Sequence, residues 1–75
     1  MKVTVLTGRW ARRYVQQEVT ELYLPDNASV EDALERLRIP LEEVGFIVIN
    51  SRVVPRKTFL HEGDSIRVYP AVIGG

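Results

Sequence analysis

The chain has 75 residues, of which ten are basic and ten are acidic, and it contains no cysteine. This length forms one domain and leaves little room for a deep active-site cleft, and the zero net charge argues against a dedicated binder of nucleic acid or anionic membranes. The missing cysteines exclude a disulfide framework, a thiolate metal site and an iron–sulfur cluster.

Two segments in the first third of the chain alternate apolar and polar residues, which is typical of half-buried strands. The first covers residues 2–7, with Val3 and Val5 on one face, and Gly8 ends it. The second covers residues 20–24, with its leucines pointing inward. We therefore expect two neighbouring strands in this part of the chain.

The stretch between these strands, residues 9–18, allows two interpretations. Trp10 and Tyr14 are four residues apart and would share one face of a short helix, or else the second strand extends back to Tyr14. The mixture of cations and aromatic rings over residues 9–14 is also a pattern that can stack on nucleic-acid bases. We favour a solvated face whose aromatic rings pack onto the core.

A helix is predicted to begin after Ser29, whose hydroxyl can cap the backbone amide of Asp32. Apolar residues then recur at the spacing of one helix face. They are Val30, Ala33, Leu34 and Leu37. Pro40 is expected to end the helix, and residues 41–44 are expected to form a short turn.

The second half of the chain predicts three further strands. Residues 46–50 are apolar on both faces, which is typical of a strand with neighbours on both sides. Residues 53–54 form a short hairpin arm, and the following Pro55 indicates an edge position. A turn in which Gly63 can take a positive φ leads to the last strand, residues 65–69.

These elements predict an α+β fold of the β-grasp, or ubiquitin-like, type. One main helix covers one face of a mixed sheet of four to five strands, and the first and last strands pair in parallel at its centre. We expect a β-grasp domain over residues 1–70 and a flexible C-terminal tail over residues 71–75.

The tail ends in Gly74 and Gly75, which carry no Cβ and leave the last carbonyl open to attack. Such a thin segment can enter a narrow channel in another protein. The α-carboxylate of Gly75 is a poor electrophile and reacts only after activation, for instance as an acyl-adenylate. We interpret this end of the chain as the attachment point of a chemical group that other enzymes add and then remove.

Three segments carry a resemblance to a known family, namely Asn50-Ser51-Arg52-Val53-Val54, Leu60-His61-Glu62-Gly63-Asp64 and Pro70-Ala71-Val72-Ile73-Gly74-Gly75. Together they resemble the MoaD/ThiS family of ubiquitin-like sulfur carriers along the whole chain, and the small subunit of molybdopterin synthase in particular. Two features depart from that subunit. Ala71 stands where a second proline is common, and Val54-Pro55-Arg56 is similar to the hairpin of the thiamine carrier.

The resemblance implies a carrier protein and not an enzyme. A ubiquitin-activating-type partner would use ATP to adenylate Gly75, and a persulfide sulfur donor would convert the acyl-adenylate to a thiocarboxylate. The large catalytic subunit of molybdopterin synthase, or another sulfur-acceptor enzyme, would then take the sulfur. We expect no bound cofactor, no metal, no nucleic acid and no membrane partner, and a cytoplasmic location because the N-terminus lacks an apolar signal-peptide core.

Docking on such partners requires an exposed apolar face beside the tail. Phe46 and Val48 are predicted to point outward, with Leu6 and Tyr69 nearby, unless loops cover them. Arg67 would steer the encounter or remain a solvated strand position. The predicted partner-binding residues are Phe46, Val48, Tyr69, Pro70, Val72 and Ile73.

Two other functions are compatible with the same sequence. A protein modifier would use the same tail and activation but join Gly75 to lysines of target proteins. A β-grasp RNA-binding module would act through residues 9–14 instead. His61, Asp64 and Ser65 are the residue types of a hydrolase triad, but they lie in one turn without a nucleophile elbow, so we assign them no catalytic role.

Overall fold

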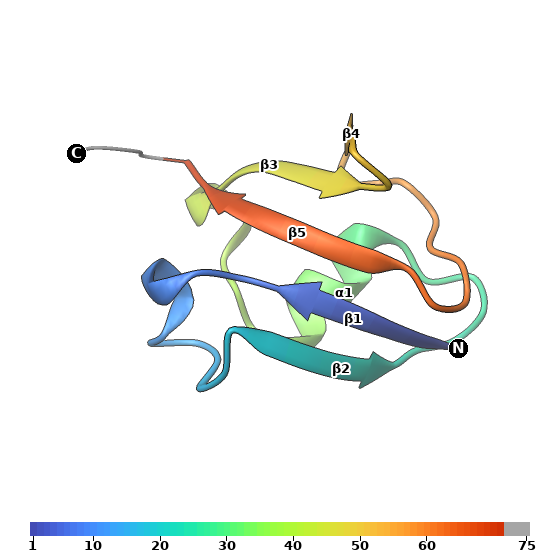
Figure 1. Ribbon diagram of the computed structural model, residues 1–75, viewed down its shortest axis with the longest axis horizontal. Coiled ribbons are helices and arrows are strands. Elements are labelled where there is room, and N and C mark those ends of the chain that lie inside the picture. The colour runs from blue at the N-terminus through green and yellow to red at the C-terminus, as the bar shows by residue number, and fades with distance from the viewer. Residues whose placement is uncertain (72–75) are drawn as a thin grey trace.

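One sheet of five strands and one α-helix make up the fold in the computed structural model, which describes residues 1–71 (Figure 1). In chain order the elements are β1 (Lys2–Leu6), the 3₁₀ helix η1 (Arg9–Ala11), β2 (Val19–Tyr23), α1 (Val30–Arg36), the 3₁₀ helix η2 (Leu41–Glu43), β3 (Val44–Ile49), β4 (Arg52–Val54) and β5 (Ser65–Pro70). The sheet order is β2-β1-β5-β3-β4, and β1 pairs with β5 in parallel. The predicted β-grasp fold is confirmed.

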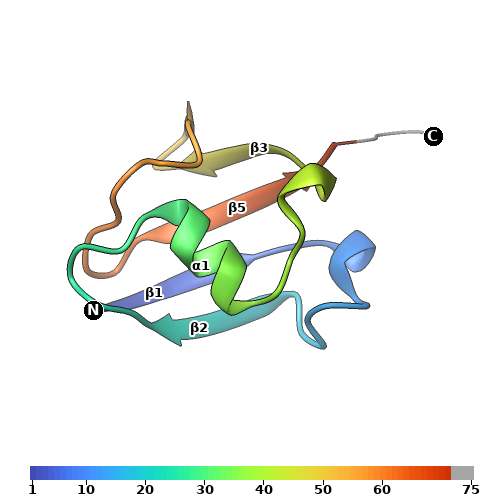
Figure 2. The ribbon, with the colours of Figure 1, turned by 180° about the vertical axis from the view of Figure 1, so that it is seen from behind.

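The hydrophobic core lies between α1 and the face of the sheet that α1 crosses, which we call the inner face (Figure 2). The strands contribute alternate residues to it, because successive side chains of a strand point to opposite faces. On β1, β3 and β5 these buried residues are Val3, Val5, Ile47, Ile49, Ile66 and Val68. Val30, Ala33 and Leu34 meet them from α1 and are at most 1% exposed, as the predicted apolar stripe required.

The start of α1 agrees with the prediction, but its end does not. Ser29 and Asp32 form a reciprocal cap in which each side chain accepts a hydrogen bond from the other's backbone amide. The helix ends at Arg36 and not near Pro40, because Arg38 takes a φ of 61°. The amide of Ile39 then bonds the carbonyl of Leu34 at 3.0 Å, which terminates the helix and buries the Ile39 side chain.

The connection between β1 and β2 begins with the short helix η1 and contains no strand before Val19, so the extended interpretation was wrong. Ala11 and Val15 are buried, and the rings of Trp10 and Tyr14 pack partly buried against the core. The cations between them, including Arg12, are exposed. This arrangement agrees with the solvated face that the sequence favoured.

The turns of the second half follow the sequence closely. Asn50 and Ser51 have φ values of 54° and 65°, which gives a two-residue hairpin turn between β3 and β4. β4 is an edge strand, as Pro55 indicated, and Gly63 has a φ of 83° in the turn before β5. No helix within residues 1–71 has the length and apolar character needed to cross a membrane.

Candidate functional site

The eight residues predicted to act in the tail or in partner binding fall into two groups. Val72, Ile73, Gly74 and Gly75 lie outside the described residues. Phe46 and Val48 lie in β3, and Tyr69 and Pro70 lie at the end of β5, which is the strand that leads into the tail. The structure therefore describes the base of the tail and the surface next to it.

The base of the tail is held by backbone contacts with the start of β3. Pro70 lies opposite Val44 in the antiparallel pairing of β5 with β3. One residue further, the amide of Ala71 donates a hydrogen bond to the carbonyl of Glu43 at 2.9 Å. The direction in which the chain leaves the sheet is thus fixed up to Ala71.

Gly45 allows this close approach of the two strands. The register between β3 and β5 shifts between Val44 and Phe46, so Gly45 occupies an irregularity of the ladder. A Cβ atom at Gly45 would lie 2.4 Å from the carbonyl oxygen of Pro70 and 2.9 Å from its carbonyl carbon. Any side chain at this position would push the base of the tail away from β3.

The connection between β1 and β2 also reaches the base of the tail. The phenol of Tyr14 donates a hydrogen bond to the carboxylate of Glu43, the residue whose carbonyl holds Ala71. This hydrogen bond, together with partial burial, raises the pKa of Tyr14 above its ordinary value. We call Tyr14, Glu43, Gly45 and the Pro70–Ala71 backbone the tail clamp.

Sequence reasoning named Pro70 as a partner-binding residue and Tyr14 as an aromatic ring near the core, but it did not predict that they meet Glu43 and Gly45 in the tail clamp. Tyr14 and Glu43 are separated by 29 positions, and no local pattern predicts a contact over that distance. Gly45 carried one usable signal, because an isolated glycine beside a strand pattern often marks a bulge or a close backbone approach.

The face of the sheet opposite α1, which we call the outer face, is not covered by any described element (Figures 1 and 2). Phe46 and Tyr69 stack on it, with ring centroids 4.6 Å apart and an interplanar angle of 14°. They remain 39% and 37% exposed, and Val48 on the same face is half-buried. The structure thus places both Phe46 and Val48 outward, while their role in binding stays a prediction.

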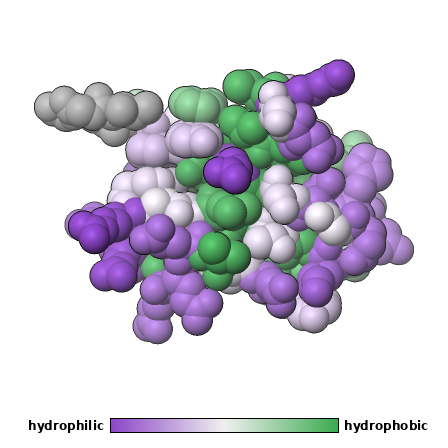
Figure 3. All heavy atoms as spheres, in the orientation of Figure 1, coloured by the Kyte–Doolittle hydropathy of each residue, from purple (hydrophilic) through white to green (hydrophobic). Residues whose placement is uncertain are grey.

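Apolar side chains gather on the outer face in a band that crosses the sheet (Figure 3). Next to the base of the tail lies a groove of about 350 Å³, whose lining includes Leu6, Trp10, Tyr69 and Pro70. A flat apolar face with a shallow groove suits docking on a larger protein better than it suits catalysis. The described residues therefore offer a docking surface beside the base of the tail.

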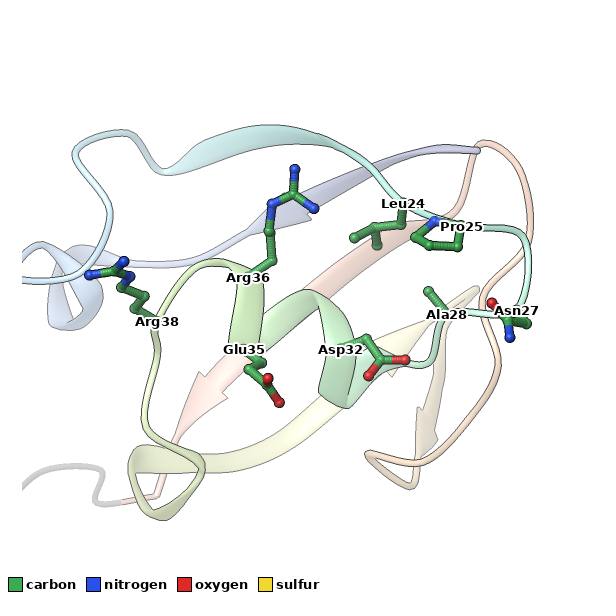
Figure 4. A pocket seen from close by; sticks show the side chains of 8 residues that line it. All are labelled: Leu24, Pro25, Asn27, Ala28, Asp32, Glu35, Arg36 and Arg38. Atoms are coloured by element: carbon green, nitrogen blue, oxygen red, sulfur yellow. The ribbon is translucent and has the colours of Figure 1, made fainter.

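A larger hollow, of about 630 Å³, lies beside α1 and away from the tail clamp (Figure 4). Its lining consists of Leu24, Pro25, Asn27, Ala28, Asp32, Glu35, Arg36 and Arg38. The carboxylates and guanidinium groups point in different directions, and the Asp32 carboxylate already accepts the amide of Ser29. We assign no chemistry to this hollow.

The turn that contains His61 and Asp64 is structural. The Asp64 carboxylate accepts the backbone amide of His61 at 2.9 Å, and the His61 ring nitrogen Nδ1 lies 4.0 Å from the same oxygen. The His61 side chain is 85% exposed. This geometry fixes the turn before β5.

Residues 9–73 of the chain match the model of the Mut7-C ubiquitin family. Among curated proteins, no sequence matches the chain. The family match covers most of the β-grasp fold and includes residues of the tail clamp and of the outer face.

Solved structures share the fold over almost their whole length. A protein from Pyrococcus furiosus, described as a molybdopterin converting factor subunit 1, is 25% identical, with 96% of this chain and 99% of that chain covered and a TM-score of 0.76. SAMP1 from Haloferax volcanii is 16% identical, with 100% of both chains covered and a TM-score of 0.77.

A crystal structure of small archaeal modifier protein 1 from H. volcanii is 15% identical, covers 95% of this chain and 98% of that chain, and has a TM-score of 0.76. Together with the family match, these likenesses confirm the predicted resemblance to proteins with the ubiquitin-like sulfur-carrier fold.

Proposed function

Because this chain belongs to the Mut7-C ubiquitin family, we propose that it is a cytoplasmic sulfur carrier whose Gly75 carboxyl group is activated and thiolated by partner enzymes. The observation that carries the proposal is the placement of the tail base. Ala71 is hydrogen-bonded to Glu43 next to the exposed Phe46–Tyr69 pair. A partner docked on the outer face would therefore meet the chain at Ala71, whose position beside β3 is fixed by this hydrogen bond.

The proposed chemistry begins with the Gly75 carboxylate attacking the α-phosphorus of ATP in an adenylating enzyme, which releases pyrophosphate and leaves an acyl-adenylate. The terminal sulfur of a persulfide donor then displaces AMP. A second thiol cleaves the resulting acyl disulfide, which leaves a thiocarboxylate on Gly75 and a disulfide on the donor. The sulfur acts as the nucleophile in the acceptor enzyme.

This chain's own residues contribute position and access. Gly74 and Gly75 carry no side chain that would keep an enzyme's reactive groups away from the carboxyl carbon. The tail clamp fixes the backbone up to Ala71, and a fixed orientation is what lowers the barrier of a reaction between two bound groups. ATP and the persulfide are handled by the partner enzymes.

The acceptor that we propose is the precursor of molybdopterin, with this chain as the small subunit of molybdopterin synthase. The likeness to a P. furiosus protein described as a molybdopterin converting factor subunit supports this choice. A thiamine-type acceptor is the alternative, which the Val54-Pro55-Arg56 segment favours. The chemistry at Gly75 is the same in both pathways.

A protein modifier is the second candidate, and the likeness of fold to small archaeal modifier protein 1 favours it. The ε-amine of a lysine on a target protein would then attack the Gly75 acyl carbon, directly or after transfer of the acyl group to an enzyme thiol, so that an isopeptide bond forms and AMP is released. High-molecular-weight conjugates in cell extracts that disappear when Gly75 is deleted would support the modifier. Their absence, together with a thiocarboxylate on Gly75, would support the carrier.

The proposed activation is tested by ATP–pyrophosphate exchange with the adenylating enzyme of the same organism. We expect exchange with the wild-type chain and none with a variant that carries one additional residue after Gly75. Both proteins should melt at the same temperature, because the addition lies beyond the sheet. Full exchange by the extended variant would contradict the proposal.

A further inference from the structure

A single lateral row of residues crosses the whole outer face. The pairing registers place Val19 opposite Leu6, Leu6 opposite Arg67, Arg67 opposite Val48 and Val48 opposite Val53. Directly opposite residues of neighbouring strands lie on the same face of a sheet and within contact distance. Val19, Leu6, Arg67, Val48 and Val53 therefore form one row over five strands, which we call the outer row.

The outer row is apolar on both sides of one cation. Val19 is 52% exposed and Val53 is 69% exposed at the two sheet edges, while Leu6 and Val48 are half-buried and Arg67 is exposed. Figure 3 shows the same pattern as a hydrophobic band that is interrupted near its middle by hydrophilic atoms.

Arg67 has no acidic partner within the part of the chain that the structure describes. The ion pairs found there are Met1–Asp26, Lys2–Glu21, Arg56–Glu31 and His61–Asp64. A guanidinium group between two apolar pairs is well placed to receive a carboxylate, because its planar fork donates two parallel hydrogen bonds. Apolar contacts on both sides would exclude water from such a pair and strengthen it.

The charge pattern decides between the possible occupants of the outer row. A second copy related by a twofold axis through the row would bring two Arg67 guanidinium groups together, and like charges in an interface disfavour association. An RNA strand requires several cations to neutralise successive phosphates, and the row provides one. A protein surface with a carboxylate between apolar side chains complements both features.

We propose that the outer row is the docking surface for a protein that presents one aspartate or glutamate side chain between two apolar patches, and that Arg67 pairs with this carboxylate. The inference rests on the proposed function, which makes the adenylating enzyme the partner. Arg67 and Tyr69 belong to the strand that carries the tail base. A carboxylate held on Arg67 would therefore also determine where the tail enters the partner.

The test measures binding of the adenylating enzyme of the same organism by titration calorimetry with the wild-type chain, three variants of Arg67 and one control variant. We expect R67E to weaken binding by about tenfold or more, because it replaces an attraction by a repulsion. R67L should also bind more weakly, since it leaves the partner's carboxylate unpaired, and R67K should retain part of the affinity. R12E is the matched control, because Arg12 is exposed but lies in the β1–β2 connection.

Equal or tighter binding by R67L would overturn the inference, because a purely apolar partner gains from that change. An equal loss with R12E would overturn it as well, since it would indicate a general charge effect. If the wild-type chain shows neither binding nor ATP–pyrophosphate exchange, the proposed function itself fails. If the wild-type chain shows both binding and exchange, and R67L binds with the same affinity as the wild-type chain, only the proposed role of Arg67 fails.

A charge reversal in the partner completes the test. Acidic residues on the adenylating enzyme's docking side are changed to lysine one at a time and assayed with the R67E variant. One of them should restore binding to R67E while weakening binding to the wild-type chain. Failure of every such reversal to restore binding would overturn the proposed pairing.

Discussion

The two faces of the sheet are built from the same strands but differ in what covers them. On β3, Ile47 and Ile49 point inward and are at most 6% exposed, whereas Phe46 and Val48 point outward to a face that none of the elements within residues 1–71 covers. The inner face therefore stabilises the fold, whereas the outer face leaves apolar surface exposed, which we propose as the docking surface for a partner. Substitutions on the two faces should separate folding from docking.

The largest expected effect is on the inner face. Leu34 is fully buried in α1, so Leu34→Ala should lower the free energy of unfolding by about 2–5 kcal/mol through lost burial and a residual cavity. Urea unfolding measures this loss. Leu34→Met, which nearly conserves volume, is the control and should cost less than about 1.5 kcal/mol. A loss below that value for Leu34→Ala would show that the inner face is not the main source of stability.

The tail clamp lies where the start of β3 meets the end of β5, and Gly45→Ala tests it. The new methyl group would meet the Pro70 carbonyl, so we expect a stability loss of about 1–3 kcal/mol and a misdirected tail. Adenylation should show a reduced kcat with little change in the affinity for the adenylating enzyme.

Gly8→Ala serves as the matched glycine control for this experiment. A Cβ there would be 3.1 Å from the Trp10 side chain and makes no contact with the tail base. Equal losses of kcat in Gly8→Ala and Gly45→Ala would show that Gly45 has no specific role in positioning the tail.

On the outer face, Phe46→Ala should leave folding nearly intact. The ring is partly exposed, and its stacking on Tyr69 contributes about 0.5–1.5 kcal/mol. Affinity for the adenylating enzyme should fall by about tenfold, because Phe46 lies next to the outer row and aromatic residues often dominate the binding energy of an interface. Calorimetry and a thermal melt on the same sample compare the two effects. Unchanged affinity together with strong destabilisation would assign Phe46 to the core instead.

The smallest effect concerns the hydrogen bond from Tyr14 to Glu43. The pKa of Tyr14 is raised in the folded state, so its neutral form is favoured there. Its contribution to stability is present below the ordinary tyrosine pKa of about 10 and is lost as the pH rises through the raised value. The difference in melting temperature between the wild-type chain and Tyr14→Phe should therefore shrink in alkaline buffer. A difference that does not vary with pH would contradict this assignment.

Much of the fold could be predicted because local patterns and tertiary packing agree. The alternation of apolar and polar residues correctly predicted which residues of β1 and β5 point inward. Ser29 predicted the start of α1, and Gly63 predicted a turn with positive φ. The end of α1 was missed because Arg38 adopts the left-handed conformation that usually favours glycine. Because the prediction relied on Pro40, it placed the end of α1 later in the chain than Arg36, where the helix ends.

The candidate site could be predicted only in part. The run over β3 is apolar on both faces, so its alternation alone could not decide which residues point outward. Pairing with β5 decides it, because Ile47 lies opposite the buried Val68 and Phe46 lies opposite Tyr69. The Tyr14–Glu43 contact joins distant segments and depends on the sheet having formed.

The central claim, that Gly75 carries the reactive carboxyl group, is tested most directly by the intact mass of the protein purified from its own cells, followed by fragmentation. The chain has one methionine, and its oxidation adds nearly the same mass as an oxygen-to-sulfur exchange, so the fragments must locate the change. We predict sulfur in place of one oxygen on the fragment that ends in Gly75. An unmodified carboxylate there, in cells that make sulfur-containing cofactors normally, would contradict the account.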